Sequence, residues 1–232
     1  RSLTPIHDSA IMMLILMCEG SDHAAPIFAK NDDIVNWVLR TIDEECGVQP
    51  LPHENSVEAL SLLVGSGVQK PSEMLIGTEN LKHIFKTIAV LNDKALKTTG
   101  KGITEDEIHC FAHALNILKS LAGSSIACAE ALLASDAEGD TNILKLYAKV
   151  ASGTCAQIMR EGVYDVLQLL VARKGKVSAS VDATRANKDI ASKILMVMDV
   201  QVLIDVMNSF PEELHCVTHV VKLLCSCMEN DN

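Results

Sequence analysis

The stretch Ile158-Met-Arg-Glu-Gly-Val-Tyr-Asp-Val-Leu-Gln-Leu-Leu170 carries a pattern that recurs along the chain. In it a turn former, Gly162, is followed by apolar residues at the spacing of one helix face. The turn formers of the four copies are Asp33, Asn80, Gly162 and Asp199. Their gaps of 47, 82 and 37 residues fit a unit of about 40 residues with one copy skipped. A period of this length predicts a helical solenoid.

A second apolar stripe is clearest at residues 114–122, which have the sequence Ala-Leu-x-x-Leu-x-x-Leu-Ala. Its copies begin at residues 10, 59, 114, 143, 183 and 220, so the period is irregular. The 55-residue gap before residue 114 contains a polar stretch, which we interpret as an insertion near residues 92–103. The 29-residue gap after it leaves room for one helix, at about residues 124–134, and predicts a truncated repeat near residues 123–140. Thr104 and Glu107 have the spacing of a capping box, which predicts that a helix begins there.

These two stripes resemble parts of armadillo repeats. The stripe at residues 114–122 is similar to the third helix of such a repeat, and residues 158–170 are similar to the segment leading into and through the second helix of the next. The resemblance implies an all-α fold, a right-handed α-solenoid of about five to six irregular armadillo-like repeats forming a single domain over residues 1–232. Each repeat has too large an apolar face to bury alone, and stacking of the repeats would join these faces into one core.

The composition limits the function classes. The chain has 232 residues, 48% of them hydrophobic, and a formal net charge of −10, which argues against a nucleic-acid-binding protein that depends on many phosphate contacts. Eight cysteines without a Cys-x-x-Cys pair predict reduced thiols in a cytoplasmic protein. The longest apolar run, Ala10 to Cys18, is far shorter than the ~20 residues of a membrane-spanning helix, so we expect no transmembrane segment.

The most specific local signal is a Glu-x-His-Cys-x-x-His motif that occurs twice, at residues 107–113 and 213–219. Two histidines four residues apart on a helix could share a metal ion, but the copies lie 106 residues apart and lack further ligands at suitable spacing. No metal or other cofactor is therefore predicted. A helical wheel places His109 and His113 opposite the apolar side of their helix and Cys110 nearer to it, which predicts solvated histidines and packed cysteines.

In an armadillo solenoid the exposed face of the third helices lines a concave groove, so the resemblance implies binding residues on that face. The Trp-x-x-x-Asn pairs of nuclear-import adaptors are absent from the equivalent positions. In the C-terminal half these positions are basic, which resembles the groove of beta-catenin-like proteins and suggests an acidic partner; an ordinary solvated lysine face is the alternative. The predicted groove residues are Asn116, Ser120, Lys145, Lys149, Arg185, Lys222, His109, His113, His215 and His219.

We therefore predict a non-catalytic, cytoplasmic scaffold or adaptor that holds a protein or peptide segment in its groove. The first alternative is a membrane-associated adaptor, held at the cytosolic face of a membrane by a lipid anchor upstream of Arg1, where the sequence begins without a methionine. The second is a metal-dependent or thiol enzyme that uses the two histidine-cysteine motifs. Incomplete end repeats would expose apolar flanks, which also permits oligomerisation.

Overall fold

The computed structural model describes residues 5–76, 78–97, 103–134, 142–153, 155–173, 181–209, 212 and 214–230. Within these ranges the regular secondary structure consists of thirteen helices without a strand, which confirms the all-α prediction for the described residues. The contacts divide the chain into two compact units, Arg1–Ser124 (unit 1) and Ser125–Asn232 (unit 2).

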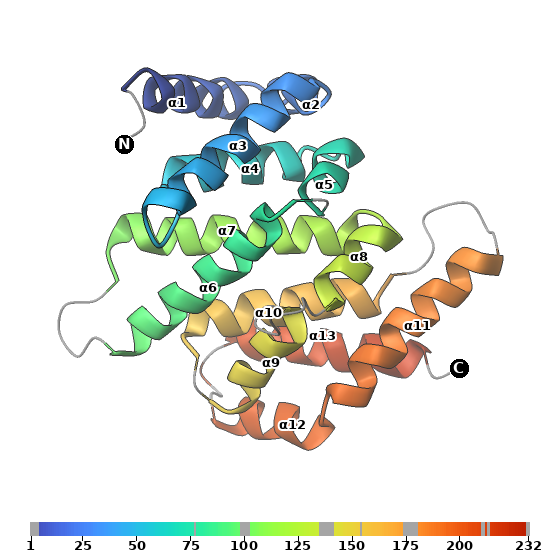
Figure 1. Ribbon diagram of the computed structural model, residues 1–232. Coiled ribbons are helices and arrows are strands. Elements are labelled where there is room, and N and C mark those ends of the chain that lie inside the picture. Colours follow the sequence, from blue (N-terminus) through green and yellow to red (C-terminus); the bar gives the residue numbers. More distant parts are fainter. Residues whose placement is uncertain are drawn as a thin grey trace. The chain divides into compact units, whose positions relative to one another are not determined.

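The helices of unit 1 are α1 (Pro5–Glu19), α2 (Ala24–Ala29), α3 (Asp32–Val48), α4 (Glu54–Gly65), α5 (Gln69–Ile76), α6 (Asn80–Lys97) and α7 (Glu105–Gly123). The helices α1, α4 and α7 lie side by side in that order, and α4 makes its most extensive contact with α7 (Figure 1). Each of α4 and α7 also packs on the long helix that precedes it, α3 or α6. The same arrangement of short, long and final helix thus occurs twice in unit 1, as α2–α4 and α5–α7.

The core of unit 1 is apolar along the faces that these helices share. Leu60 and Leu63 of α4, with Phe111 and Leu118 of α7, are fully buried. Burying a side chain of this size stabilises the folded state by roughly 1.5–3 kcal/mol before conformational entropy is counted. The helical wheel therefore identified the buried side of α7 correctly.

Side-chain caps fix where two of these helices begin. The Asn31 side chain accepts hydrogen bonds from the backbone N–H groups of Asp33 and Ile34, at 3.0 and 3.4 Å, at the start of α3. At the start of α7, Thr104 Oγ1 accepts from the Glu107 N–H at 3.3 Å, and the Glu107 carboxylate accepts from the Thr104 N–H at 3.0 Å. The predicted capping box is confirmed.

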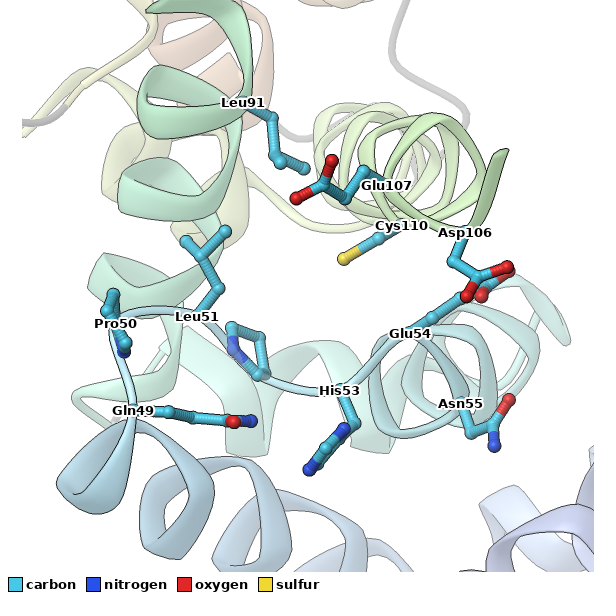
Figure 2. A pocket seen from close by; sticks show the side chains of 11 residues that line it. Gln49, Pro50, Leu51, His53, Glu54, Asn55, Leu91, Asp106, Glu107 and Cys110 are labelled. Carbon is cyan, nitrogen blue, oxygen red and sulfur yellow. The ribbon is translucent and has the colours of Figure 1, made fainter. Parts of the chain in front are cut away.

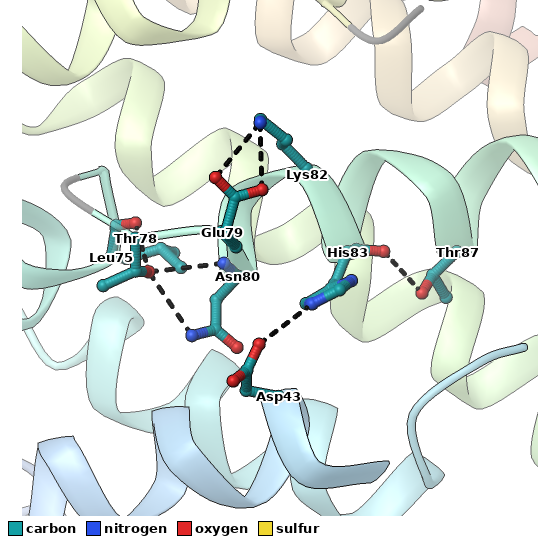
Figure 3. A network of polar contacts seen from close by, with 8 residues as sticks. All are labelled: Asp43, Leu75, Thr78, Glu79, Asn80, Lys82, His83 and Thr87. Carbon is teal, nitrogen blue, oxygen red and sulfur yellow. Dashed lines mark hydrogen bonds and ion pairs between the residues drawn. The ribbon is translucent and has the colours of Figure 1, made fainter. Parts of the chain in front are cut away.

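A polar contact links the two long helices α3 and α6 on the surface of unit 1 (Figure 3). His83 Nε2 of α6 lies 3.2 Å from Asp43 Oδ1 of α3. One turn along α6, the Thr87 hydroxyl donates to the His83 carbonyl at 2.8 Å, which satisfies a hydroxyl that would otherwise be buried alone. At the start of α6, the Thr78 hydroxyl accepts from the Asn80 N–H at 3.3 Å.

Unit 2 contains α8 (Ile126–Leu133), α9 (Ile143–Ala151), α10 (Gln157–Val171), α11 (Val181–Val197), α12 (Val200–Ser209) and α13 (Leu214–Asn230). Its most extensive helix contact joins α10 to α13, as α4 joins α7 in unit 1. Contacts also join α8 to α11 and α9 to α12. Each of α8, α9 and α10 therefore contacts the helix three places later in the chain. This pattern groups unit 2 into two sets of three helices, α8–α10 and α11–α13.

This grouping corrects the sequence interpretation of residues 158–170. Asp33, Asn80 and Asp199 do lie at helix starts, but Gly162 lies in the interior of α10 and is buried. A glycine inside a helix costs about 1 kcal/mol relative to alanine. The neighbours of Gly162 in α10, Met159 and Val163, are fully buried. Because α10 pairs with α13, it corresponds to the last helix of a set, whereas the sequence interpretation had given that place to the helices at residues 143 and 183.

Two predicted irregularities have partial outcomes. Helix α6 continues to Lys97, so the first part of the predicted 92–103 insertion is helical, while residues 98–102 lie outside the described residues. The single helix expected at about residues 124–134 is present as α8. The truncation expected near residues 123–140 depends on treating α9 as the final helix of a repeat, and it stays a prediction. The remainder of that segment, residues 135–140, lies outside the described residues.

Candidate functional site

The exposed seam between α4 and α7 carries matched polar side chains. His109 Nδ1 lies 3.2 Å from Glu54 Oε1, and His113 Nε2 lies 3.7 Å from Glu58 Oε1. In each pair the histidine follows its glutamate by 55 residues in the sequence. The two helices therefore run in the same direction in constant register. We call this set the α4–α7 row; it consists of Glu54, Glu58, His109, His113, Asn116 and Ser120.

The row includes the four groove residues predicted for unit 1, all of which lie on α7. His109 and Asn116 are exposed, whereas His113 and Ser120 are half-buried. At the far end of the row Gly65 faces Ser120, and a Cβ added at Gly65 would lie 3.7 Å from Ser120 Oγ. A hollow of about 300 Å³ opens at this end, and its lining includes Gly65, Ser120 and Gly123.

The second histidine-cysteine motif lies in a corresponding place in unit 2. His219 Nδ1 of α13 lies 2.5 Å from Asp165 Oδ1 of α10. His215 and Lys222, on the same helix, are exposed. In both units, therefore, the second histidine of the motif meets a carboxylate on the helix beside it, His113 with Glu58 and His219 with Asp165.

The predicted basic ladder is distributed over three kinds of helix. Lys145 is exposed and Lys149 half-buried on α9, Arg185 is exposed on α11, and Lys222 is exposed on α13. Among the described helices of unit 2, the extensive contacts include α10–α13 and α11–α13 but not α9–α13. The predicted ladder thus combines residues of α9, α11 and α13, and its role as a groove stays a prediction.

The cysteine of the first motif faces away from the exposed row. Cys110 is 5% exposed, and burial, followed by the negative charges of Glu54, Glu107 and Glu45, raises the pKa of its thiol to about 12. A thiol with this pKa remains protonated near neutral pH, so it is a poor nucleophile. In the part of the chain that the structure describes, no three His, Cys, Asp or Glu side chains converge in a way that could hold a metal ion.

A cavity of about 410 Å³ opens beside the Glu54–His109 pair of the α4–α7 row (Figure 2). Its wall is formed by the α3–α4 connection, the first turn of α4, Leu91 of α6 and the first turns of α7. The lining residues are Gln49, Pro50, Leu51, Pro52, His53, Glu54, Asn55, Leu91, Asp106, Glu107 and Cys110. Glu54 belongs both to the cavity and to the row, so the two features are continuous.

A buried carboxylate holds the α3–α4 connection in place. Glu45 is 4% exposed and accepts hydrogen bonds from the His53 N–H at 2.9 Å and from the Ser56 hydroxyl at 2.7 Å. Burial raises the pKa of Glu45, although these two hydrogen bonds oppose the effect. The connection that forms the cavity wall is therefore anchored at both the end of α3 and the start of α4.

Sequence reasoning found the histidines of these seams but not their carboxylate partners. Glu54 and Glu58 could have been found, because the 55-residue gap between the stripes at 59 and 114 is the register in which α4 and α7 pack. No corresponding signal was available for Asp165, since the helix that carries it was assigned to a different place in the repeat.

None of the described helices combines the length and apolar character needed to cross a membrane. No model of a known protein family, no curated protein and no solved structure matches this chain.

Proposed function

We propose that this chain is a non-catalytic protein-binding scaffold built from armadillo-like repeats. The repeats would be the three-helix sets α2–α4, α5–α7, α8–α10 and α11–α13, preceded by α1 as the last helix of an incomplete set. This assignment is supported by contacts between helices three places apart in the chain, which recur within each unit: α1–α4, α4–α7 and α3–α6 in unit 1, and α8–α11, α9–α12 and α10–α13 in unit 2. It replaces the five to six irregular repeats expected from sequence with four complete sets, in a right-handed solenoid as the resemblance implies.

The observation that carries the binding proposal is the α4–α7 row. Two parallel helices in constant register present polar side chains at regular intervals on a surface backed by a buried core. Such a surface is formed before a partner arrives, so a partner segment loses less free energy to ordering of the binding site. An extended or helical segment would lie across the row and contact Asn116 and His109, which are its exposed members on α7.

The exposure of the two histidine-glutamate pairs determines which side chains of the row a partner can contact. His109 is exposed, with 55% of its side chain accessible, although it faces Glu54. His113 and Glu58 are more enclosed, with side chains 25% and 18% accessible, and their role would be to hold the seam. A partner would therefore gain most from His109, Asn116 and the start of the cavity at Glu54.

The test is affinity capture from native cytosol with quantitative mass spectrometry, using the wild type and the double variant His109→Ala/Asn116→Ala. The matched control is Asn36→Ala/Arg40→Ala, which truncates two exposed residues four apart on α3. We expect captured proteins to be lost from the row variant and retained by the control. Hydrogen exchange on a captured complex should show protection along α4 and α7.

Capture of the same proteins by the row variant, together with unchanged exchange along α4 and α7, would place recognition elsewhere on the molecule. A Lys222→Glu variant tests the acidic-partner prediction in unit 2, because Lys222 is an exposed cation on α13. Loss of partners from this variant, with a Lys145→Glu variant unaffected, would support an acidic segment on the α13 surface.

A further inference from the structure

The mouth of the 410 Å³ cavity has an excess of negative charge. Its lining includes Glu54, Asp106 and Glu107 but no lysine or arginine. Glu107 receives the Lys94 ammonium, at 2.6 Å from Oε2, and Glu54 faces the His109 imidazole. Asp106 is exposed and makes no hydrogen bond or ion pair with another described residue. The three carboxylates of the lining thus have one lysine, Lys94, as a nearby ion-pair partner.

The inner wall of the same cavity is apolar. Leu51, Leu91 and Pro52 line it, and Leu91 and Pro52 are themselves buried. Figure 2 shows the sulfur of Cys110 pointing into the hollow from α7. This thiol is 95% buried, since its exposed fraction is 5%, and it makes no hydrogen bond with any other described residue. A thiol is a weak donor that an aliphatic chain can cover at little cost.

Electrostatics at the cavity floor agree with the charges at its mouth. After burial, the causes that raise the pKa of Cys110 are the charges of Glu54, Glu107 and Glu45. All three carboxylates disfavour a negative charge on the Cys110 sulfur, which agrees with the excess of carboxylates at the mouth. A ligand for this cavity should therefore combine a cationic group with an apolar body.

We propose that the cavity binds an alkylammonium group, with its aliphatic chain against Leu51 and Leu91 and its ammonium between Asp106 and Glu54. An ammonium donates three hydrogen bonds and matches separate carboxylate acceptors, whereas the methylene chain removes apolar wall from water. This site shares Glu54 with the α4–α7 row, but its ligand binds inside the cavity and requires no partner on the row. The alkylammonium group can come from a lysine side chain of a protein or from a free polyamine.

The experiment titrates the full chain with N-acetyl-lysine methylamide, putrescine and spermidine, followed by amide NMR shifts and calorimetry. The neutral analogues are N-acetyl-(Nε-acetyl)lysine methylamide and 1,4-butanediol, which keep the aliphatic chain without the charge. We expect shifts at Leu51, Leu91 and Cys110 with the cations and none with the neutral analogues. Tighter binding of the lysine amide than of putrescine indicates a protein side chain, and tighter binding of the polyamines indicates a free amine.

The double variant Glu54→Gln/Asp106→Asn removes two charges at the mouth. Loss of each charge should weaken binding of the cations about fivefold. The matched control Glu19→Gln/Asp22→Asn removes two exposed charges at the end of α1 and in the turn after it. Equal weakening in both variants would mean that amines are attracted to an acidic protein in general and would overturn the site. Absence of cation-dependent shifts at the three lining residues would overturn it as well, whatever happens on the α4–α7 row.

Discussion

The cysteine thiols of this chain differ in their access to solvent, and this difference predicts their order of alkylation. Cys225 is exposed, whereas Cys110 and Cys128 are 5% and 0% exposed. Since burial raises the pKa of Cys110 to about 12, only about one molecule in ten thousand carries its thiolate near pH 8. We expect iodoacetamide to modify Cys225 first under native conditions, with Cys110 and Cys128 protected until the chain unfolds. Peptide mass spectrometry of timed samples measures this, and early modification of Cys110 would contradict its placement.

Glu45 gives a prediction for the dependence of stability on pH. Burial raises its pKa above the ordinary 4.5, so the folded chain holds this proton more tightly than the unfolded chain. Stability rises with pH only where the unfolded state binds more protons, and here the folded state binds more. Relative to the non-titrating variant Glu45→Gln, the wild type should therefore lose stability as the pH rises from 4.5 through the folded pKa.

Urea denaturation of the two proteins at stepped pH measures this difference. The control is Glu44→Gln, which changes the exposed neighbour of Glu45 on α3 and should leave the slope of the wild type unchanged. A difference that grew in favour of the wild type with rising pH would mean that the hydrogen bonds from Ser56 and His53 outweigh burial. The carboxylate would then be held ionised in the folded state.

The residue types in the candidate site were accessible from sequence, but their partners were less so. His109 and His113 were expected to be solvated; His109 is exposed, whereas His113 is half-buried, and both face carboxylates of α4. A helical wheel describes one helix, so it cannot show that a neighbouring helix carries an acid at the same height. The cavity depends on the α3–α4 connection, and its walls come from four segments that no local pattern links.

At the scale of elements, the start of α7 makes a quantitative prediction. Thr104→Ala removes the side chain that accepts the Glu107 N–H, and loss of such a cap costs about 1 kcal/mol, within a range of about 0.5–2 kcal/mol. Thr104→Ser keeps the hydroxyl and should retain most of the stability. Urea denaturation gives the free energy of unfolding of each variant. An equal loss for serine and alanine would show that the methyl group of Thr104, rather than its hydroxyl, matters at this position.

Helix existence was easier to predict than helix correspondence. The stripes at residues 10, 59 and 114 became α1, α4 and α7, which do lie side by side. The same stripe at residue 143 became α9, a helix of nine residues that packs on α10. Both α9 and α10 carry apolar residues at helical spacing, because both contribute to the core, and periodicity does not distinguish which of them pairs with α13. Only the contact between α10 and α13 settles that question.

At the scale of the whole molecule, apolar surface remains on α1 and α13. Met13 and Leu16 of α1 are 62% and 61% exposed, while Ile11 and Leu14 on the opposite side of the helix are buried. On α13, Leu214 and Met228 are 73% and 71% exposed, whereas Val220 and Leu223 are buried. A helix that is apolar on both sides normally has neighbours on both sides. The sequence predicts a single domain, whereas the contacts divide the chain into two compact units, so the dependence of each unit's stability on the other becomes a quantity to measure.

Reciprocal core substitutions measure that dependence. Leu60 of unit 1 and Leu167 of unit 2 are both fully buried, and replacing either with alanine should cost about 2–5 kcal/mol in its own unit. Because each unit is compact, we expect Leu60→Ala to accelerate amide hydrogen exchange in α3, α4, α6 and α7 while α10 and α13 remain protected. Leu167→Ala should produce the opposite pattern. Exchange that accelerated equally throughout the chain in both variants would mean that the two units unfold as one, and the division would then be geometric rather than energetic.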